Sequence, residues 1–450
     1  MVRFISLRKW IWTQMIFFVA CDSKVNHTTT FNEDIAPIIF KNCTPCHHPG
    51  AAGPFDLLTY EDVVTHAANV RVTIISKYMP PWPADPNYRH FAGEKVLSES
   101  AIRLICEWMD NGMPEGDDKK KPEAADFHSS MIGKPDLTLR LSEMIRIPGD
   151  NKDRFLMMKV PIELEKDTFV RLIEIVPDNR KLVHHINGHL IRYEEKKKKD
   201  LGKGSPFVDT ELHDKSEAYQ LLGLPNDDGT YPVLTPSVTN YLPGVEPATY
   251  PEGIGGYRLS KKSVLLLDII HYGPSPIDTT DRTTFNLFYQ PVAPKRPTKE
   301  FILGTSGISP IVPPLVVQAG KKQSFRTQYV IPEDISLLTI NPHMHLLGSS
   351  FKAYALAKAG DTIPLINIPR WDFRWQYFYT FEKIIHLPQG TTIVAEGIFD
   401  NTENNPLNPF NPPKTISERE GSMRTTDEMF QLICTYLPYR KGDENISLKR

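Results

Sequence analysis

Cysteine is scarce in this chain, which has five cysteines among its 450 residues. So few thiols exclude the class of small secreted scaffolds that disulfides hold together. Cys106 and Cys434, which belong to no motif, are expected to be buried free thiols. The net charge is only −2 and no basic stripe is present, so the composition gives no indication of nucleic-acid binding.

The N-terminus has the form of a targeting segment. Residues 1–21 begin with basic side chains and continue into an apolar stretch that is too short to span a bilayer comfortably. The stretch ends at Ala20-Cys21, which resembles a lipoprotein cleavage box with a lipid on Cys21. An ordinary cleaved signal peptide and an uncleaved anchor are the alternatives. All three interpretations predict an exported protein of the periplasm or cell envelope, anchored to the membrane if Cys21 carries lipid.

A motif for covalent haem attachment lies at residues 43–47, Cys-Thr-Pro-Cys-His. Two thiols three residues apart at the end of a helix can form thioethers with both haem vinyl groups, and His47 can then ligate the iron. A redox-active Cys-x-x-Cys pair is the alternative, but no thioredoxin-like βαβ pattern surrounds the motif. We therefore predict one covalently attached haem c, held by Cys43, Cys46 and His47.

The sixth ligand of the haem iron must come from further along the chain. Met79 begins a proline-locked segment, Met-Pro-Pro-Trp-Pro, which favours it over Met109 and Met113 near a helix end. His66 is the alternative ligand. Ligation by one histidine and one methionine would make the haem a relatively high-potential one-electron carrier.

Residues 28–116, which contain the haem motif, are expected to form a small all-α domain. A capped helix is predicted over 98–111 because apolar residues recur there at helical spacing and Gly112 follows. The unit resembles cytochrome c. Residues 117–133 are expected to be a linker, since their opening is too polar to bury.

The chain from residue 134 onward has an almost wholly β pattern. Short apolar runs alternate with clusters of proline, glycine and other turn residues, and roughly 310 residues suits two stacked sandwiches better than one. A boundary near residues 310–314 divides this part into two all-β sandwich domains, 134–308 and 309–440. Three of the clearest predicted strands are 169–176, 263–270 and 391–399.

Histidines of the β region form three groups. His343 and His345 are two residues apart, so an extended chain places both imidazoles on one side. His184 and His185 are adjacent, so they can share a metal only at a β-bulge or a strand end. His271 ends an apolar run and needs either a hydrogen bond or a metal. Taken singly, each group favours ordinary surface or core histidines over a metal site.

The order of these groups along the chain, followed by Asp-Glu-Met at 427–429, resembles the type-2 copper, ascorbate-dependent monooxygenases. That family includes peptidylglycine α-hydroxylating monooxygenase and dopamine β-monooxygenase. The resemblance covers about residues 134–440 and implies two copper ions on two jelly-roll-like β-sandwich domains. The ligands implied for one copper are His184, His185 and His271. The catalytic ligands implied for the second copper, which binds O₂ and abstracts hydrogen from substrate, are His343, His345 and Met429.

The activity that the resemblance implies is hydroxylation of a C–H bond of a small organic substrate, with one oxygen of O₂ going to water. Two external electrons are needed per turnover. Ascorbate supplies them in the animal enzymes, and here the haem is expected to pass them to the three-histidine copper from ascorbate or a redox protein. No match exists for residues that hold a peptide carboxylate or for the animal family's disulfides. Candidates for lining a substrate pocket are Asn187, Tyr272, Arg374 and Tyr379.

Two other functions fit the same ligands. One is a non-catalytic haem and copper electron-transfer or copper-binding protein on the same scaffold. The other is a structural sandwich whose histidines hold a metal only for rigidity. His189, His213 and His386 are expected to be surface, core or supporting residues. Convergence of the two ligand sets on two points that face each other across a solvent-filled gap would favour the enzyme.

Overall fold

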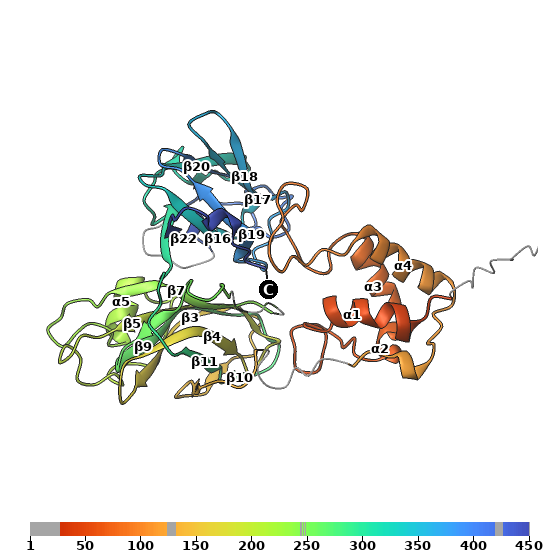
Figure 1. Cartoon of the computed structure of the whole chain (residues 1–450), viewed down its shortest axis with the longest axis horizontal. Coiled ribbons are helices and arrows are strands. Elements are labelled where there is room, and N and C mark those ends of the chain that lie inside the picture. Colours follow the sequence, from red (N-terminus) through yellow and green to blue (C-terminus); the bar gives the residue numbers. More distant parts are fainter. Residues whose placement is uncertain are drawn as a thin grey trace, which may run out of the picture.

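The computed structural model describes residues 28–123, 132–243, 245, 247, 249–418 and 426–449. Three regions follow one another along the chain: a helical N-terminal region and two β-sandwiches (Figure 1). The predicted signal segment, Cys21 and much of the predicted linker lie outside the described residues. Within the part of the chain that the structure describes, no helix has both the length and the apolar composition needed to cross a bilayer.

The N-terminal region contains four of the five α-helices found in the described residues. They are α1 (Ala36–Asn42), which continues the π-helical turn Phe31–Ile35, α2 (Tyr60–Thr65), α3 (Ala67–Ile75) and α4 (Glu99–Asp110); a 3₁₀ turn, Asp118–Lys120, follows. The predicted helix over 98–111 is confirmed as α4. Ser98 caps it by accepting a hydrogen bond from the Ala101 amide at 3.1 Å, and its buried face packs Ile105 and Trp108 against the other helices.

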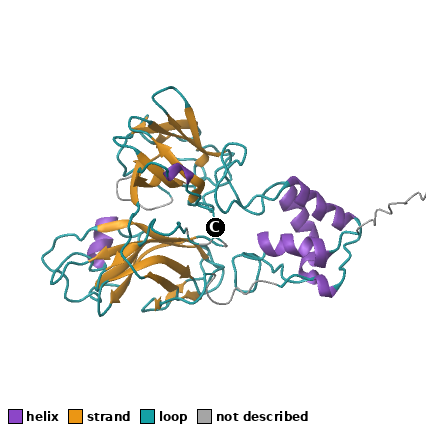
Figure 2. Cartoon of the chain, in the orientation of Figure 1, coloured by secondary structure: helices purple, strands orange, loops and turns teal. Residues whose placement is uncertain are grey.

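The fold class predicted from the sequence is wrong in its first part. The described chain is mainly β-sheet (Figure 2), its helices have only six to twelve residues, and no all-α cytochrome c domain is evident in it. The segment after α3 has four prolines within residues 80–86, so it leaves the helices and extends to the second sandwich. There Phe91 is 2% exposed in the sandwich core and forms a β-bridge with Phe381.

The first sandwich confirms the predicted β architecture. One sheet has the order β1 (Leu137–Arg140), β11 (Thr284–Gln290), β4 (Thr168–Val176), β8 (Tyr257–Leu259). The facing sheet has the order β6 (Phe207–Asp209), β3 (Arg154–Glu163), β9 (Lys262–Tyr272), β5 (Val183–Arg192), β7 (Leu234–Tyr241). A separate pair joins β2 (Ile145–Ile147) to β10 (Thr279–Asp281), and the fifth helix is α5 (Lys215–Leu221).

The central strand of this sandwich, β9, is covered on both faces, which explains its continuous apolar run. Leu265 and Leu267 face the core between the sheets, whereas Val264 and Leu266 pack in the cluster that includes α5. This packing holds the strand between two layers, and His271 is its second-to-last residue.

The second sandwich has the same two-sheet plan with its own core. One sheet has the order β12 (Lys299–Gly304), β22 (Phe430–Pro438), β16 (Ile335–Met344), β19 (Tyr379–Leu387). The other has the order β13 (Ile311–Val312), β15 (Lys322–Val330), β20 (Thr392–Asp400), β17 (Gly348–Leu356), β18 (Thr362–Ile368). A short pair joins β14 (Val316–Val317) to β21 (Ile416–Ser417), and a 3₁₀ turn spans Asp443–Asn445.

The join between the sandwiches lies before the expected boundary at 308. Strand β12 precedes that residue, yet it pairs with β22 of the second sandwich. The cysteines predicted to be free thiols are free, with Cys434 fully buried and Cys106 half-buried.

Candidate functional site

Three histidines from the first sandwich come together at the ends of β5 and β9. His185 and His271 are register partners on the two strands, and the ladder is shifted between Val183 and His185. His184 is therefore the bulged residue, which meets the condition for two adjacent histidines to reach one side. The ring centroids of His184 and His185 lie 4.7 Å and 5.1 Å from that of His271.

The hydrogen bonds of this group determine which ring nitrogens are available. His271 Nε2 pairs with the Asp153 carboxylate at 2.6 Å. The Nδ1 atoms of His184, His185 and His271 are all closed off from solvent without a hydrogen-bond partner in the described structure. Three buried ring nitrogens without partners in one place are costly unless a further group satisfies them. A metal that binds imidazole nitrogen fits this need, and the carboxylate on His271 is a typical support for a metal-bound histidine.

The protonation of these rings also suits metal binding. Burial, and then the nearby His271, lower the pKa of His184 to about 4. Burial and the surrounding histidines lower the pKa of His185 well below its ordinary value. Both imidazoles are therefore neutral at pH 7, the form in which they ligate metals.

Gly273 is a residue of this group that the sequence did not indicate. A Cβ atom placed there would lie 2.5 Å from Nε2 of His184, closer than two such atoms can approach. A side chain at this position would therefore require the ring of His184 to move. The glycine directly after His271-Tyr272 was the sequence feature that could have indicated this close approach.

The second group lies where β16 ends, in the other sandwich. The rings of His343 and His345 are 5.0 Å apart, on one side of the chain as period two requires. Nδ1 of His343 contacts the side-chain oxygen of Gln376, and Nδ1 of His345 lies 2.8 Å from the Asp427 carbonyl oxygen. Because both acceptors are oxygens, each Nδ1 carries the proton, and Nε2 is the nitrogen suited to a metal.

Met429 is brought to this pair by the pairing of β16 with β22. Met344 and Phe430 are the last register partners of this antiparallel pair, and just beyond them lie His345, which follows Met344, and Met429, which precedes Phe430. Glu428 strengthens the junction, because its buried carboxylate accepts hydrogen bonds from the backbone amides of His345 at 3.2 Å and Leu347 at 2.8 Å. Two imidazoles and a thioether thus belong to one corner of the second sandwich.

A single aromatic ring contacts both histidine groups. Phe373, in the loop between β18 and β19, lies 6.0 Å from His185, 5.9 Å from His271 and 5.7 Å from His345, measured between ring centroids. The two predicted ligand sets therefore meet at the junction of the sandwiches, although they come from distant parts of the sequence. Phe373 was not predicted, and the aromatic-rich loop Trp-Asp-Phe-Arg-Trp-Gln at 371–376 was the available signal.

The histidine groups are close but not closed around a point. Among the described side chains, no three His, Cys, Asp or Glu residues already stand in position to hold a metal ion. A metal at either site would have to draw the rings together by side-chain rotation.

The residues predicted to line a pocket have other partners. Tyr272 is fully buried and donates to Asp281 at 3.0 Å, and Asn187 donates to Asp268 at 3.0 Å. Arg374 pairs with Asp372 at 2.5 Å. Tyr379 is buried in an aromatic cluster. The remaining histidines have structural contacts: His189 with Asp268, His213 with Glu217, and His386 with the ring of Tyr439.

The haem motif lies in a compact turn after α1. Cys43 and Cys46 are free thiols, and the amides of Cys46 and His47 both donate to the Cys43 carbonyl, at 3.1 Å and 3.0 Å. His47 Nδ1 lies 2.9 Å from the Phe55 carbonyl oxygen, so Nε2 is the nitrogen suited to iron. Gly53 is required here, since a Cβ would lie 2.5 Å from the Cys46 carbonyl oxygen.

The two candidates for the sixth iron ligand lie in different surroundings. His66 stacks on Phe55 with centroids 3.9 Å apart, and Phe55 also contacts the His47 ring at 5.0 Å. Met79 lies beyond α3, at the start of the proline-rich segment that leads to the second sandwich. Met79 as the sixth ligand, with His66 as the alternative, therefore stays a prediction.

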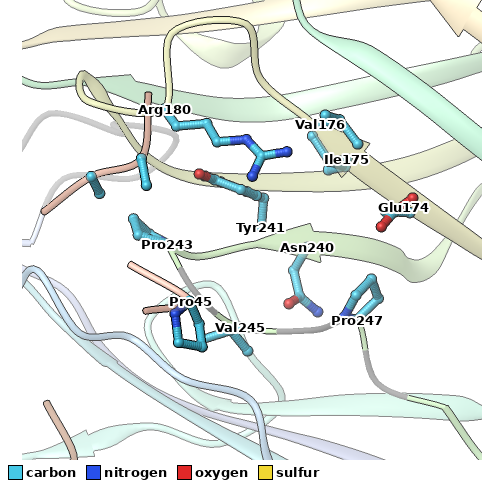
Figure 3. Close-up of a pocket in the computed structure, with 12 residues that line it drawn as sticks. Pro45, Glu174, Ile175, Val176, Arg180, Asn240, Tyr241, Pro243, Val245 and Pro247 are labelled. Atoms are coloured by element: carbon cyan, nitrogen blue, oxygen red, sulfur yellow. The ribbon is translucent and has the colours of Figure 1, made fainter. Parts of the chain in front are cut away.

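The haem-motif turn faces the first sandwich across a small cavity. Pro45 lies on one side of it, and Arg180, Asn240 and Tyr241 lie on the other (Figure 3). Its volume of about 30 Å³ has room for water but not for a haem or a substrate. The lining residues show that the haem-motif turn lies beside the first sandwich.

Comparisons with known proteins leave the family open. No protein-family model matches the sequence, and a search of curated proteins finds no match either. Among solved structures, the chain has a slight similarity to the "Structure of infectious bursal disease virus Gx strain". That match has a TM-score of 0.17 at 10% identity, covering 72% of this chain and 77% of the viral chain, and it carries no argument about fold or function.

Proposed function

We propose that the chain is an exported copper-dependent monooxygenase that hydroxylates a C–H bond of a small organic substrate with O₂. The observation that carries the proposal is the meeting of two separate histidine groups, one from each sandwich, around Phe373. Each sandwich has its own apolar core, so the two groups come from separately packed units. A reaction that stores an electron at one copper and activates O₂ at the other needs two such groups in one molecule.

The donor atoms of both groups suit copper. In the first group, Nδ1 atoms of His184, His185 and His271 would hold one ion, satisfying their orphaned lone pairs. In the second, Nε2 atoms of His343 and His345 with the Met429 thioether would hold the other. Copper, when bound, would supply one-electron redox chemistry at the first site and O₂ activation at the softer second site.

The chain's own residues would orient these ligands and keep their protonation fixed. Asp153 accepts a hydrogen bond from Nε2–H of His271, which leaves Nδ1 free to bind the metal. Gln376 and the Asp427 carbonyl accept hydrogen bonds from Nδ1 of His343 and His345, which leaves Nε2 of each free to bind the metal. Burial, and then His345, lower the pKa of His343 to about 3, so that ring stays neutral and able to ligate.

The haem-motif residues support a built-in electron supply. Cys43 and Cys46 would attach a haem through thioethers, and His47 would ligate its iron; the haem, when bound, would carry single electrons. The expectation from the sequence was delivery to the three-histidine site. Hydrogen bonds also connect the proline-rich segment after Met79 to the group of His343 and His345. Tyr377 donates to the Pro81 carbonyl at 2.7 Å, and the residue before Tyr377 is Gln376, whose side chain contacts His343.

The second candidate is a haem and copper electron-transfer protein without hydroxylase activity. It is favoured by the packed contact of Phe373 with both histidine groups, in place of the solvent-filled gap expected for the enzyme. Under either function, ascorbate or a redox protein would be the external donor. The export signal and a lipid anchor at Cys21 remain part of the proposal.

The test combines O₂ consumption with the haem spectrum. Copper-loaded protein is first reduced with ascorbate, so that the haem and both copper ions hold the two electrons that one turnover needs, and is freed of excess reductant. It is then mixed with O₂ and each member of a small-metabolite panel, with Met429→Ala as the control. The enzyme predicts that one metabolite accelerates O₂ uptake and haem reoxidation together and gains one ¹⁸O atom from ¹⁸O₂, and that Met429→Ala loses all three. Haem reoxidation by copper with no labelled product for any metabolite would favour the electron-transfer protein. No effect of copper on haem reoxidation would contradict both.

A further inference from the structure

Phe373 occupies the junction between the two histidine groups. Its side chain is 6% exposed, and its ring is nearly perpendicular to those of His185, at 83°, and His345, at 88°. It also contacts His271 at 48°. No other residue in the described aromatic contacts touches histidines of both sandwiches. The ring has no donor or acceptor for a metal, so its role must lie in packing.

The loop holds this ring in a defined place. Asp372 and Arg374, on either side of Phe373, form an ion pair at 2.5 Å, and the Trp371 amide donates to the Ser349 carbonyl at 2.9 Å. Gln376 closes the turn by donating to the Phe373 carbonyl at 2.9 Å. Each of these bonds reduces the freedom of the loop backbone around the ring.

The same glutamine links the ring to the second histidine group. Its nitrogen binds the backbone of Phe373 and its oxygen contacts Nδ1 of His343. The loop next to it is tied to β16, because Asn341 donates to the Tyr377 carbonyl at 2.9 Å. Phe373 is thus part of the second sandwich, and it reaches across to His185 and His271 of the first.

We propose that Phe373 is a positioning residue that sets the separation of the two metal sites and excludes water between them. The inference rests on the proposed function only in that both histidine groups bind copper. Close packing makes the ring an incompressible spacer, since protein interiors have little free volume to absorb a shift. The apolar ring also keeps the space between two positive ions free of water.

This arrangement differs from the solvent-filled gap that the family resemblance led us to expect. An electron that passes between the two groups would cross one aromatic side chain rather than water. Removing the ring should therefore change the geometry between the sites while leaving each ligand set intact. A purely structural role would instead lower stability without changing the distance between bound ions.

The experiment uses the full-length protein loaded with Cu(II), which serves as the probe. Copper content is measured first, and then the dipolar broadening of the Cu(II) EPR spectrum and the deuterium modulation of its electron spin echo in D₂O. Phe373→Ala and Phe373→Leu are compared with Phe325→Leu, a phenylalanine that is 2% exposed in the same sandwich and packs on Phe399.

The proposal predicts dipolar broadening in the wild type, altered broadening and stronger deuterium modulation in Phe373→Ala, and a smaller change in Phe373→Leu. Phe325→Leu should match the wild type. If Phe373→Ala fails to fold, Phe373→Leu carries the test. Unchanged broadening and modulation in variants that still bind two copper ions would overturn the positioning role and leave the proposed function standing. A wild type that binds no copper would overturn the proposed function itself.

Discussion

The two histidine groups use the same side chain but present opposite ring nitrogens. In the first sandwich, Asp153 accepts a hydrogen bond from Nε2 of His271, and the Nδ1 atoms of all three histidines are buried without a partner in the described structure. In the second sandwich, the side-chain oxygen of Gln376 and the Asp427 carbonyl accept hydrogen bonds from Nδ1 of His343 and His345, respectively. The comparison teaches that a neighbouring acceptor decides which ring nitrogen of His271, His343 and His345 stays free, and under the proposed function the free nitrogen would bind the metal.

The groups also differ in what surrounds them. The first has an aspartate that is about half exposed, whereas the second rests on Glu428, a carboxyl that is 1% exposed. Burial raises the pKa of Glu428 to about 8, against the opposing effect of the backbone amides that donate to it. The first group is thus tied to a charged residue near the surface, and the second to the interior. Under the proposed function, the first group would store the electron and the second, more buried group would activate O₂.

The strongest test of the comparison removes one ligand at a time. His185→Ala and His343→Ala should each reduce bound copper from two ions per chain to one, because each leaves only two ligands at its own site. Elemental analysis after dialysis measures the content. His213→Ala, which removes a histidine paired only with Glu217, is the matched control. Retention of both ions by His185→Ala would show that the first group is not a copper site.

Replacing the thioether should affect one group only. Met429→Leu keeps the apolar volume but removes the soft sulfur, so Cu(I) affinity at the second site should fall by at least about tenfold. Competition with a chromophoric Cu(I) chelator measures the affinity. Met158→Leu, a core methionine of the first sandwich that is 1% exposed, should have no effect. Equal weakening of both sites by Met429→Leu would contradict the assignment.

Removing the acceptors should have a smaller effect on the same sites. Asp153→Asn should weaken copper at the first site, and Gln376→Leu at the second, by about 10–100-fold each, as is usual for residues that support metal ligands. Site-resolved Cu(II) EPR during a copper titration distinguishes the two. Asp150→Asn, three residues from Asp153 and paired with Arg154, is the control. A loss at the opposite site in either variant would break the proposed pairing.

The smallest effect on copper should come from a residue that supports the fold alone. Burial would raise the pKa of Asp443, but bonds from Arg296 and Ser336 outweigh it and lower the pKa to about 2. Asp443→Asn should cost about 1–3 kcal/mol of unfolding free energy at pH 7, because it leaves a buried guanidinium poorly paired. Copper content should not change.

The pH dependence of that variant follows from the sign of the shift. Because the folded pKa is below the unfolded one, the carboxylate stabilises the wild type above the unfolded value and loses this effect as the pH falls from about 4 to about 2. The stability gap between wild type and variant should therefore close over that range in urea titrations. Glu99→Gln, which breaks an exposed pair with Lys77, should leave stability unchanged at every pH.

Local patterns in the sequence predicted much of this structure. Period two placed His343 and His345 on one side, and a bulge, one of the two arrangements that would let His184 and His185 share a metal, is found. Helix α4 was predicted from its capping residue and from the helical spacing of its apolar residues. These features depend on a few neighbouring residues, which is why a single sequence contains them.

Features that depend on distant contacts could not be read in this way. The fold class failed because helical spacing marks the helices but does not reveal that Phe91 enters the core of the second sandwich. Phe373 and Asp153 act on histidines about one hundred residues or more away, and no short motif marks them. The sandwich boundary was misplaced because β12 pairs with β22, over one hundred residues later.

Copper-edge anomalous diffraction from crystals of the copper-loaded protein tests the central claim most directly. The account predicts two peaks on either side of the Phe373 ring. One should lie against the Nδ1 atoms of His184, His185 and His271, and the other against Nε2 of His343 and His345 and the sulfur of Met429. A single shared peak, or peaks away from both histidine groups, would contradict it.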